Sequence, residues 1–192
     1  ITSCSPGWIN FIEYFYPNSL DNLSSCKSPQ QMFGALTKTY YAEKFDLDPA
    51  NIISVSIMPC LAKKFEAGRP EMTDSGYADV DYVLSVRELA RMIREAGIDF
   101  AKLEEREYDD PLGISTGAGL IFGATGGVME AAIRTVYEIV TKDELKNLDF
   151  KPVRGLKGIK EAALEIEGQK LLVAVAHGLK NARQLLEQIE EG

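Results

Sequence analysis

Short runs of β-branched residues alternate with helical patterns along this chain, and this alternation constrains its fold more than any other feature. Residues 52–58 (Ile-Ile-Ser-Val-Ser-Ile-Met) predict a buried strand, and residues 81–84 predict another. The strongest strand pattern covers residues 170–176, and residues 161–167 can pair with it through a turn at Gly168. The alternation predicts an α/β fold of mostly parallel sheets flanked by helices.

Serine, proline and glycine residues mark the expected helix starts. Ser28 to Gln31 and Ser85 to Glu88 both have the sequence of a capping box, and Ser5 to Gly7 resembles a third helix start. Further helices are expected after Gly126-Gly127 and over residues 179–189.

Composition and charge limit the partners of the chain. The hydrophobic fraction of 45% supports a sizeable core, in one domain or in two small intimate lobes without a separable linker. The net charge of -8 argues against nucleic acid or an anionic membrane as a partner. No apolar run is long enough to predict insertion into a membrane, and no signal peptide is visible. Because the chain opens on Ile1, we expect a fragment or a processed piece.

Three cysteines, Cys4, Cys26 and Cys60, are too few and too sparse for a disulfide framework. Reduced thiols suit a reducing compartment, so the expected location is cytoplasmic. Cys60 follows the predicted strand directly and precedes two lysines, Lys63 and Lys64, which would favour its thiolate. Thiolates bind iron, although a buried cysteine beside two surface lysines accounts for the pattern equally well.

Two further segments have the form of a ligand-binding loop. Residues 2–8 place Cys4 at another junction between an extended segment and a helix. Residues 121–130 are rich in glycine, including Gly123, which lets a backbone approach a ligand closely. Alone, this glycine-rich segment is typical of a simple turn, and its spacing differs from that of known nucleotide-binding loops.

Taken together, these segments resemble the signature motifs of iron-only ([FeFe]) hydrogenases. Residues 2–8 resemble the first signature, Thr-Ser-Cys-Cys-Pro-x-Trp. Residues 58–66 match the second, Met-Pro-Cys-x-x-Lys-x-x-Glu, at every fixed position. Residues 27–31, 122–130 and 153–161 also resemble this family. The resemblance therefore covers nearly the whole chain, and it implies part of the two-lobed catalytic domain over residues 1–192.

The resemblance implies roles around an H-cluster, which joins a [4Fe–4S] cubane to a two-iron subcluster. Cys60 would be a thiolate ligand of the cubane, and Lys63 would donate a hydrogen bond to a cyanide on the two-iron subcluster. Cys4 would be the proton-relay thiol, with Ser24 as the next relay member and Glu66 among the polar surroundings. The residues expected to line the cluster pocket are Met58, Pro59, Gln30, Phe122 and Gly123.

The chain departs from the family pattern in two places. Ser5 stands where the family has a cysteine that binds the cubane, so three alternatives arise. Ser5 binds iron as a hard, poor ligand, or it is only the N-cap of a helix, or Cys4 becomes the ligand instead. The family's third motif, with two more ligands, is expected beyond Gly192, so this chain alone should not hold a complete cluster.

The implied activity is reversible oxidation of dihydrogen to protons and electrons. The expected partners are a ferredoxin-like electron carrier or cluster domain and the remaining part of the hydrogenase. The intact second motif favours the enzyme. Ser5 favours the alternative, a non-catalytic hydrogenase-like module for iron–sulfur assembly or sensing.

Overall fold

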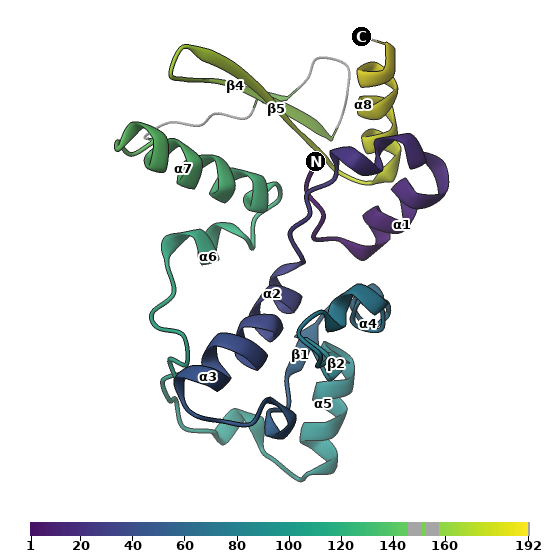
Figure 1. The fold of residues 1–192 in the computed structure, drawn as a ribbon. Coiled ribbons are helices and arrows are strands. Elements are labelled where there is room, and N and C mark those ends of the chain that lie inside the picture. Colours follow the sequence, from purple (N-terminus) through teal and green to yellow (C-terminus); the bar gives the residue numbers. More distant parts are fainter. Residues whose placement is uncertain (146–150, 153–157, 192) are drawn as a thin grey trace. The chain divides into compact units, whose positions relative to one another are not determined.

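The computed structural model describes residues 1–145, 151–152 and 158–191, and the chain forms two compact units (Figure 1). The first unit is Ile1–Gly113 and the second is Ile114–Gly192. Both units combine helices with a β-sheet, which confirms the predicted α/β class. The absence of a separable linker stays a prediction.

The first unit combines α-helices with one pair of parallel strands. Its helices are α1 (Pro6–Phe15), α2 (Pro29–Leu36), α3 (Ala42–Lys44), α4 (Ala62–Ala67) and α5 (Val86–Glu95). Its strands are β1 (Val55–Met58) and β2 (Tyr82–Ser85). Because parallel strands need a crossover, the chain passes through α4 between them, and α4 packs against β2.

The parallel pair is shorter and more exposed than the sequence predicts. Pairing begins with Val55 opposite Tyr82. It begins there because the Ser54 N–H donates to the Asp81 carboxylate, 2.7 Å from Oδ2, and so is not available to the strand ladder. Val55 and Ile57 are 51% and 47% exposed, so the prediction of a buried strand was wrong for this face of β1 in this chain.

Three helix starts lie where serine residues predict them, but only one serine caps its helix. Ser5, Ser28 and Ser85 each occupy the N-cap position. The Ser85 hydroxyl accepts from the Glu88 N–H at 3.2 Å, and the Glu88 carboxylate accepts from the Ser85 N–H at 2.7 Å, which confirms that capping box. The box predicted after Ser28 is wrong, because this hydroxyl donates to Glu66 instead.

The second unit combines helices with an antiparallel sheet. Its helices are α6 (Gly117–Ile121), α7 (Gly127–Thr141) and α8 (Leu179–Glu191). The described strands are β3 (Lys151–Pro152), β4 (Ile159–Ile166) and β5 (Gln169–Ala176), in the order β3-β4-β5. Glu167 and Gly168 join β4 to β5 with φ of 48° and 77°, the backbone of a tight hairpin turn.

This hairpin corrects the expectation of mostly parallel sheets. The predicted turn at Gly168 is confirmed, and a two-residue turn reverses the chain so that the strands it joins must be antiparallel. Parallel pairing is found between β1 and β2 only, within the described residues.

Each unit has its own small buried core. In the first unit, Phe11 and Ile12 on one face of α1 are 7% and 0% exposed. In the second unit, Ile159 of β4 is completely buried. Further buried apolar residues in the described part of the chain are Pro6, Ala42, Val80, Ala131, Ile133, Ala162 and Leu186.

Candidate functional site

Cys60 lies in the short loop between β1 and α4, at the strand end where the sequence predicts it. β1 ends at Met58, and α4 begins at Ala62. The Lys63 N–H donates to the Cys60 carbonyl at 3.3 Å, so the loop turns directly into the helix. The Cys60 side chain is exposed and its thiol is free. This thiol is therefore accessible to a ligand or a metal.

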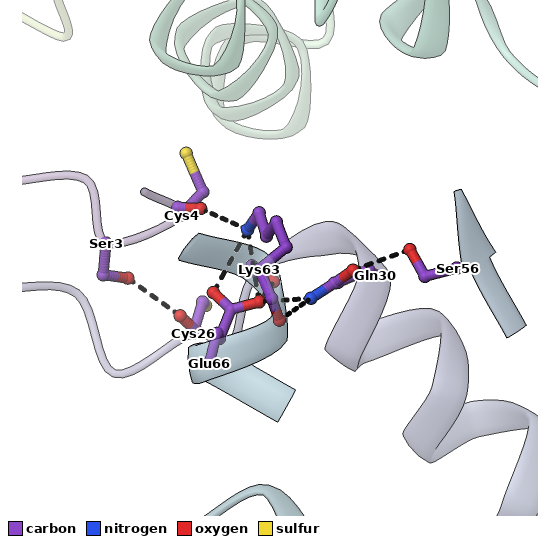
Figure 2. Close-up of polar contacts among 8 residues, drawn as sticks. Ser3, Cys4, Cys26, Gln30, Ser56, Lys63 and Glu66 are labelled. Atoms are coloured by element: carbon purple, nitrogen blue, oxygen red, sulfur yellow. Dashed lines mark hydrogen bonds and ion pairs between the residues drawn. The ribbon is translucent and has the colours of Figure 1, made fainter. Parts of the chain in front are cut away.

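The Lys63 ammonium links α4, the helix that follows Cys60, to the segment around Cys4 (Figure 2). Its Nζ donates to the Cys4 carbonyl at 2.7 Å and lies 3.1 and 3.2 Å from the two carboxylate oxygens of Glu66. The Lys63 side chain is 11% exposed. An ammonium group has three N–H donors, which matches the three acceptor atoms around Lys63 Nζ. An added anionic ligand would therefore gain an N–H of Lys63 only by replacing one of the two longer contacts to Glu66.

The Glu66 carboxylate is the buried centre of this hydrogen-bond network. Glu66 is 5% exposed. The Ser28 hydroxyl and the Gln30 Nε2 amide both donate to its Oε2 at 2.7 Å, in addition to the contact with Lys63. These donors compensate for the burial of a charged group. The fold thus brings together three residues that the sequence predicts for the site, Gln30, Lys63 and Glu66.

Two serines complete the network, and neither was predicted as a site residue. Ser28 is 2% exposed and contacts Glu66, and the Ser56 hydroxyl donates to Gln30 Oε1 at 2.6 Å. The sequence pattern assigns Ser28 to helix capping and Ser56 to a strand. Their hydrogen-bond partners lie 38 and 26 residues away, so no local sequence signal could have identified them.

The segment around Cys4 is tied to the segment that follows α1. Cys4 is half-buried, whereas Ser5 and Ser24 are exposed. The Ser24 hydroxyl accepts from the Cys26 N–H at 3.2 Å, and the Ser3 hydroxyl donates to the Cys26 carbonyl at 2.8 Å. Among the residues that the structure describes, no hydrogen bond links Cys4 to Ser24.

A cavity of about 280 Å³ lies among α1, the loop before α2 and the segment after α4. Ser24, Ser28 and Glu66 contribute to its wall, together with Ser3 and Ser25. Hydroxyl groups and a buried carboxylate therefore face a space that is large enough for several water molecules.

Ion pairs hold the outer wall of this cavity. Arg69 lies 2.6 Å from Glu13 and 2.5 Å from Glu71, and the hydrogen bond with Glu13 is the main reason that the pKa of Arg69 is raised. A backbone hydrogen bond, and then the Arg69 guanidinium, lower the pKa of Glu71. Burial is the largest single influence on the pKa of Lys27 and lowers it, but the hydrogen bonds and charges of Asp79 and Asp74 together outweigh burial, so the pKa of Lys27 is raised overall.

The other residues predicted to line the site lie outside this network. Met58 is half-buried at the end of β1, and Pro59 is exposed. Phe122 and Gly123 follow α6 in the second unit, and Phe122 is 39% exposed. The hydrogen-bonded site is therefore made of residues from the first unit.

The thiol chemistry of the chain fits part of an iron–sulfur site. A [4Fe–4S] cluster takes four ligands, usually thiolates. The chain offers Cys60, with Cys4 or Ser5 as a second donor. Within residues 1–145, 151–152 and 158–191, no group of three or more His, Cys, Asp or Glu side chains could hold a metal ion. Further cluster ligands would have to come from outside these residues.

The chain has an α/β fold with a free thiol at a strand end and a largely buried lysine one helical turn later. These features suit a protein that binds an anionic, thiolate-ligated metal group. Comparison with known proteins identifies the family to which the chain belongs. The chain belongs to the family described as iron only hydrogenase large subunit, C-terminal domain, whose model matches residues 1–192.

Curated relatives include both hydrogenases and an assembly protein. The chain is 51% identical over 192 residues to the NADP-reducing hydrogenase subunit HndD of Solidesulfovibrio fructosivorans, and this match covers the whole chain and 33% of HndD. It is 52% identical over 191 residues to the periplasmic [Fe] hydrogenase large subunit of Nitratidesulfovibrio vulgaris, covering 45% of that protein. It is 33% identical over 199 residues to cytosolic iron-sulfur assembly component 3 of Mus musculus, covering 42% of it.

Solved structures share the fold. A variant of apo [FeFe]-hydrogenase HydA1 from Chlamydomonas reinhardtii matches the whole chain with a TM-score of 0.82 and 40% identity, over 56% of the HydA1 chain. A structure described as showing stepwise [FeFe]-hydrogenase H-cluster assembly matches with a TM-score of 0.83 and 39% identity, again over 56% of its chain. The chain therefore spans about a third to just over half of the relatives that it matches.

Proposed function

We propose that this chain is part of an [FeFe] hydrogenase that interconverts dihydrogen with protons and electrons at an H-cluster. The observation that carries the proposal is the Lys63 ammonium, which follows Cys60 by one helical turn and donates to the Cys4 carbonyl, so that it lies between two of the cysteine-containing segments. Identities of 51–54% to curated hydrogenases support the same function.

Cys60 and Lys63 would have complementary roles at the cluster. The Cys60 thiolate would be one ligand of the cubane, since thiolates are the usual ligands of iron–sulfur clusters. Lys63 would release one of its two contacts to the Glu66 carboxylate and donate that N–H to a cyanide of the two-iron subcluster, while Glu66 remains its counter-ion. The residues that would line the pocket are Met58, Pro59, Gln30, Phe122 and Gly123.

Protons would reach the cluster through Cys4, with Ser24 as the preceding group. Lys63 anchors the Cys4 backbone through its carbonyl, which would hold the thiol close to the ligand that Lys63 binds. Ser24 contributes to the wall of the cavity, so water can reach its hydroxyl. Because no hydrogen bond links Cys4 to Ser24 in the described part of the chain, proton transfer between them would pass through a bridging water.

The cluster and the partners of the chain are part of the same proposal. When bound, the H-cluster supplies the redox centre for the reaction, and the residues of this chain hold it and deliver protons. The remaining part of the hydrogenase would supply further ligands, and a ferredoxin-like carrier or cluster domain would supply electrons. A cytoplasmic location stays a prediction, because one relative is periplasmic. No helix in the described part of the chain is long and apolar enough to span a bilayer.

Cysteine variants of the anaerobically cluster-loaded protein test this assignment. Cys4→Ala should keep the iron but abolish dihydrogen production from a reduced viologen dye, because only the proton donor is removed. Cys60→Ala should lose iron, because a ligand is removed. Cys26→Ala is the matched control: its thiol is free and exposed, and both iron content and activity should persist. Loss of iron from Cys4→Ala would identify Cys4 as a ligand and contradict the relay.

A second candidate function is an iron–sulfur assembly or sensory module. Ser5 supports it, because an exposed serine without a cap hydrogen bond stands where the enzymes have a cysteine ligand. Similarity to an assembly component supports it too. Iron–sulfur binding without dihydrogen production in the native protein would favour this candidate. Ser5→Cys should then increase the bound iron without creating activity.

A further inference from the structure

We propose that Ser28 and Ser56 are positioning residues for the Lys63 ammonium, and that they act through Glu66 and Gln30. The inference rests on the proposed function, in which Lys63 donates an N–H to an anionic ligand. It assigns a role to two serines that lie in neither cysteine motif, and it follows from the hydrogen bonds drawn in Figure 2.

Ser56 determines which way the Gln30 amide faces. Its hydroxyl donates to Gln30 Oε1 at 2.6 Å, which directs the amide nitrogen toward Glu66 Oε2 at 2.7 Å and toward the Lys63 carbonyl at 3.4 Å. A Gln side chain without this donor can rotate by half a turn and present its oxygen to the carboxylate. Two acceptors would then face each other, so the Gln30 donor to Glu66 would be lost.

Ser28 supplies the second neutral donor to the same carboxylate oxygen. Its hydroxyl lies 2.7 Å from Glu66 Oε2, and both side chains are more than nine-tenths buried. Ser28 is the N-cap residue of α2, yet its side chain makes no cap hydrogen bond. An N-cap hydrogen bond stabilises the first turn of a helix. The Ser28 hydroxyl therefore binds Glu66 instead of making the cap hydrogen bond that the N-cap position favours.

The two neutral donors, Ser28 and Gln30, determine how strongly the Glu66 carboxylate holds the Lys63 ammonium. Glu66 is buried, so a lone pair that loses its donor must find another or remain unsatisfied at a high cost. Lys63 Nζ is already 3.1 and 3.2 Å from the two oxygens and is the nearest remaining donor. When Ser28 or Gln30 withdraws, Glu66 draws the ammonium toward itself, away from the Cys4 carbonyl and from the ligand.

The chain of contacts links three elements to one charged group. Ser56 lies in β1, Gln30 in α2, and Lys63 and Glu66 in α4. Lys63 also reaches Cys4, 59 residues earlier in the sequence. A change in either serine therefore moves an ammonium that no serine contacts directly, which is the property of a positioning residue.

Nitrogen NMR of the lysine side chains in the cluster-free chain tests the positioning. In the native chain, the buried Lys63 ammonium should give a shifted, slowly exchanging signal, unlike the exposed Lys102. Ser28→Ala and Ser56→Ala should move the Lys63 signal and speed its exchange, while the Lys102 signal stays unchanged. Ser56→Thr keeps a hydroxyl on a strand position and should restore the native signal. An unmoved Lys63 signal in both alanine variants overturns the proposal.

Infrared spectra of the cluster-loaded protein separate this inference from the proposed function. If both are right, Lys63→Met shifts a cyanide stretching band, and the two alanine variants shift it in the same direction by a smaller amount at equal iron content. Ser56→Thr should leave the band at its native position. A band that responds to Lys63→Met but to neither serine overturns the inference alone. A moved NMR signal without any cyanide band supports the positioning and contradicts the proposed function.

Discussion

At the scale of single residues, the Lys63–Glu66 pair is the feature on which the site depends. Both side chains are largely buried, at 11% and 6% exposure, and they lie three residues apart on α4. A buried ion pair contributes little net stability, but removing one member leaves an uncompensated charge in a medium of low dielectric constant. The pair is therefore sensitive to single substitutions in a way that surface pairs are not.

Lys63→Met should destabilise the chain by roughly 3–5 kcal/mol at neutral pH, because Glu66 would remain buried with only two neutral donors. Urea unfolding measures this loss. The double variant Lys63→Met with Glu66→Gln should recover much of it, since the buried charge is then absent.

Lys64 provides the matched control on the same helix. It pairs with Glu88 at 2.6 Å, but the two side chains are 41% and 44% exposed. Lys64→Met should change stability by less than about 1 kcal/mol, as surface ion pairs usually do. Equal losses for Lys63→Met and Lys64→Met would contradict the distinction between a buried and a surface pair.

At the scale of elements, close packing of α2 against the loop before β2 limits which residues α2 tolerates. A Cβ atom on Gly34 would lie 2.0 Å from the Asp79 backbone oxygen and 2.6 Å from its carbon. Asp79 is completely buried and paired with Lys27 at 2.7 Å, which fixes its position. The glycine is therefore required for this contact.

Gly34→Ala should lower the free energy of unfolding by about 1–3 kcal/mol or more, the usual range for overpacking against a rigid neighbour. The control is Gly68→Ala, where a Cβ would make only ordinary contacts, the nearest at 3.6 Å. That variant should unfold at nearly the native urea concentration. A neutral Gly34→Ala would show that α2 can move away from Asp79.

The start of α5 should respond to acid through Glu88. Its hydrogen bond to Lys64, followed by those to the backbone and hydroxyl of Ser85, lowers the pKa of Glu88 from its ordinary 4.5 to about 2. Because the folded pKa is lowered, the stabilisation is complete above pH 4.5 and is lost as the pH falls toward 2. Carboxyl-carbon NMR titration should show this low pKa, and it should rise toward 4.5 in the Ser85→Ala, Lys64→Met variant. A native titration near 4.5 would contradict the capping box in solution.

At the scale of the whole molecule, we propose that the chain supplies only part of a cluster site. It spans 31–45% of the curated hydrogenases that it matches. Cys60, with Cys4 or Ser5, provides at most two donors from the cysteine loops, while a cubane needs four ligands. The two compact units each have a buried core.

Anaerobic reconstitution of this chain alone with iron and sulfide should give little stable four-iron cluster, because too few thiolates are available. Visible absorption, together with iron and sulfide analysis after desalting, measures the yield. The reconstituted full-length protein is the positive control. A robust four-iron spectrum from the chain alone would show that other side chains complete the ligand set.

The sequence by itself determined the features that depend on neighbouring residues. The Ser85 capping box, the start of α1 after Ser5 and the hairpin turn at Gly168 are confirmed, because each is decided within about four residues by hydrogen-bond geometry and allowed φ angles. The motif around Cys60 identified the family for the same reason: its residues are contiguous in the chain.

Only the tertiary structure decided the partners of the buried polar groups. Ser28 could cap a helix or bind Glu66, and the outcome depends on a residue 38 positions away. Lys63 could face solvent or the Cys4 carbonyl, and that outcome depends on a residue 59 positions away. A buried hydroxyl or ammonium must find a partner wherever packing places one, since an unsatisfied group in the interior is costly. The packing of α1, α2, β1 and α4 together determines these hydrogen-bond partners, and no single segment determines them alone.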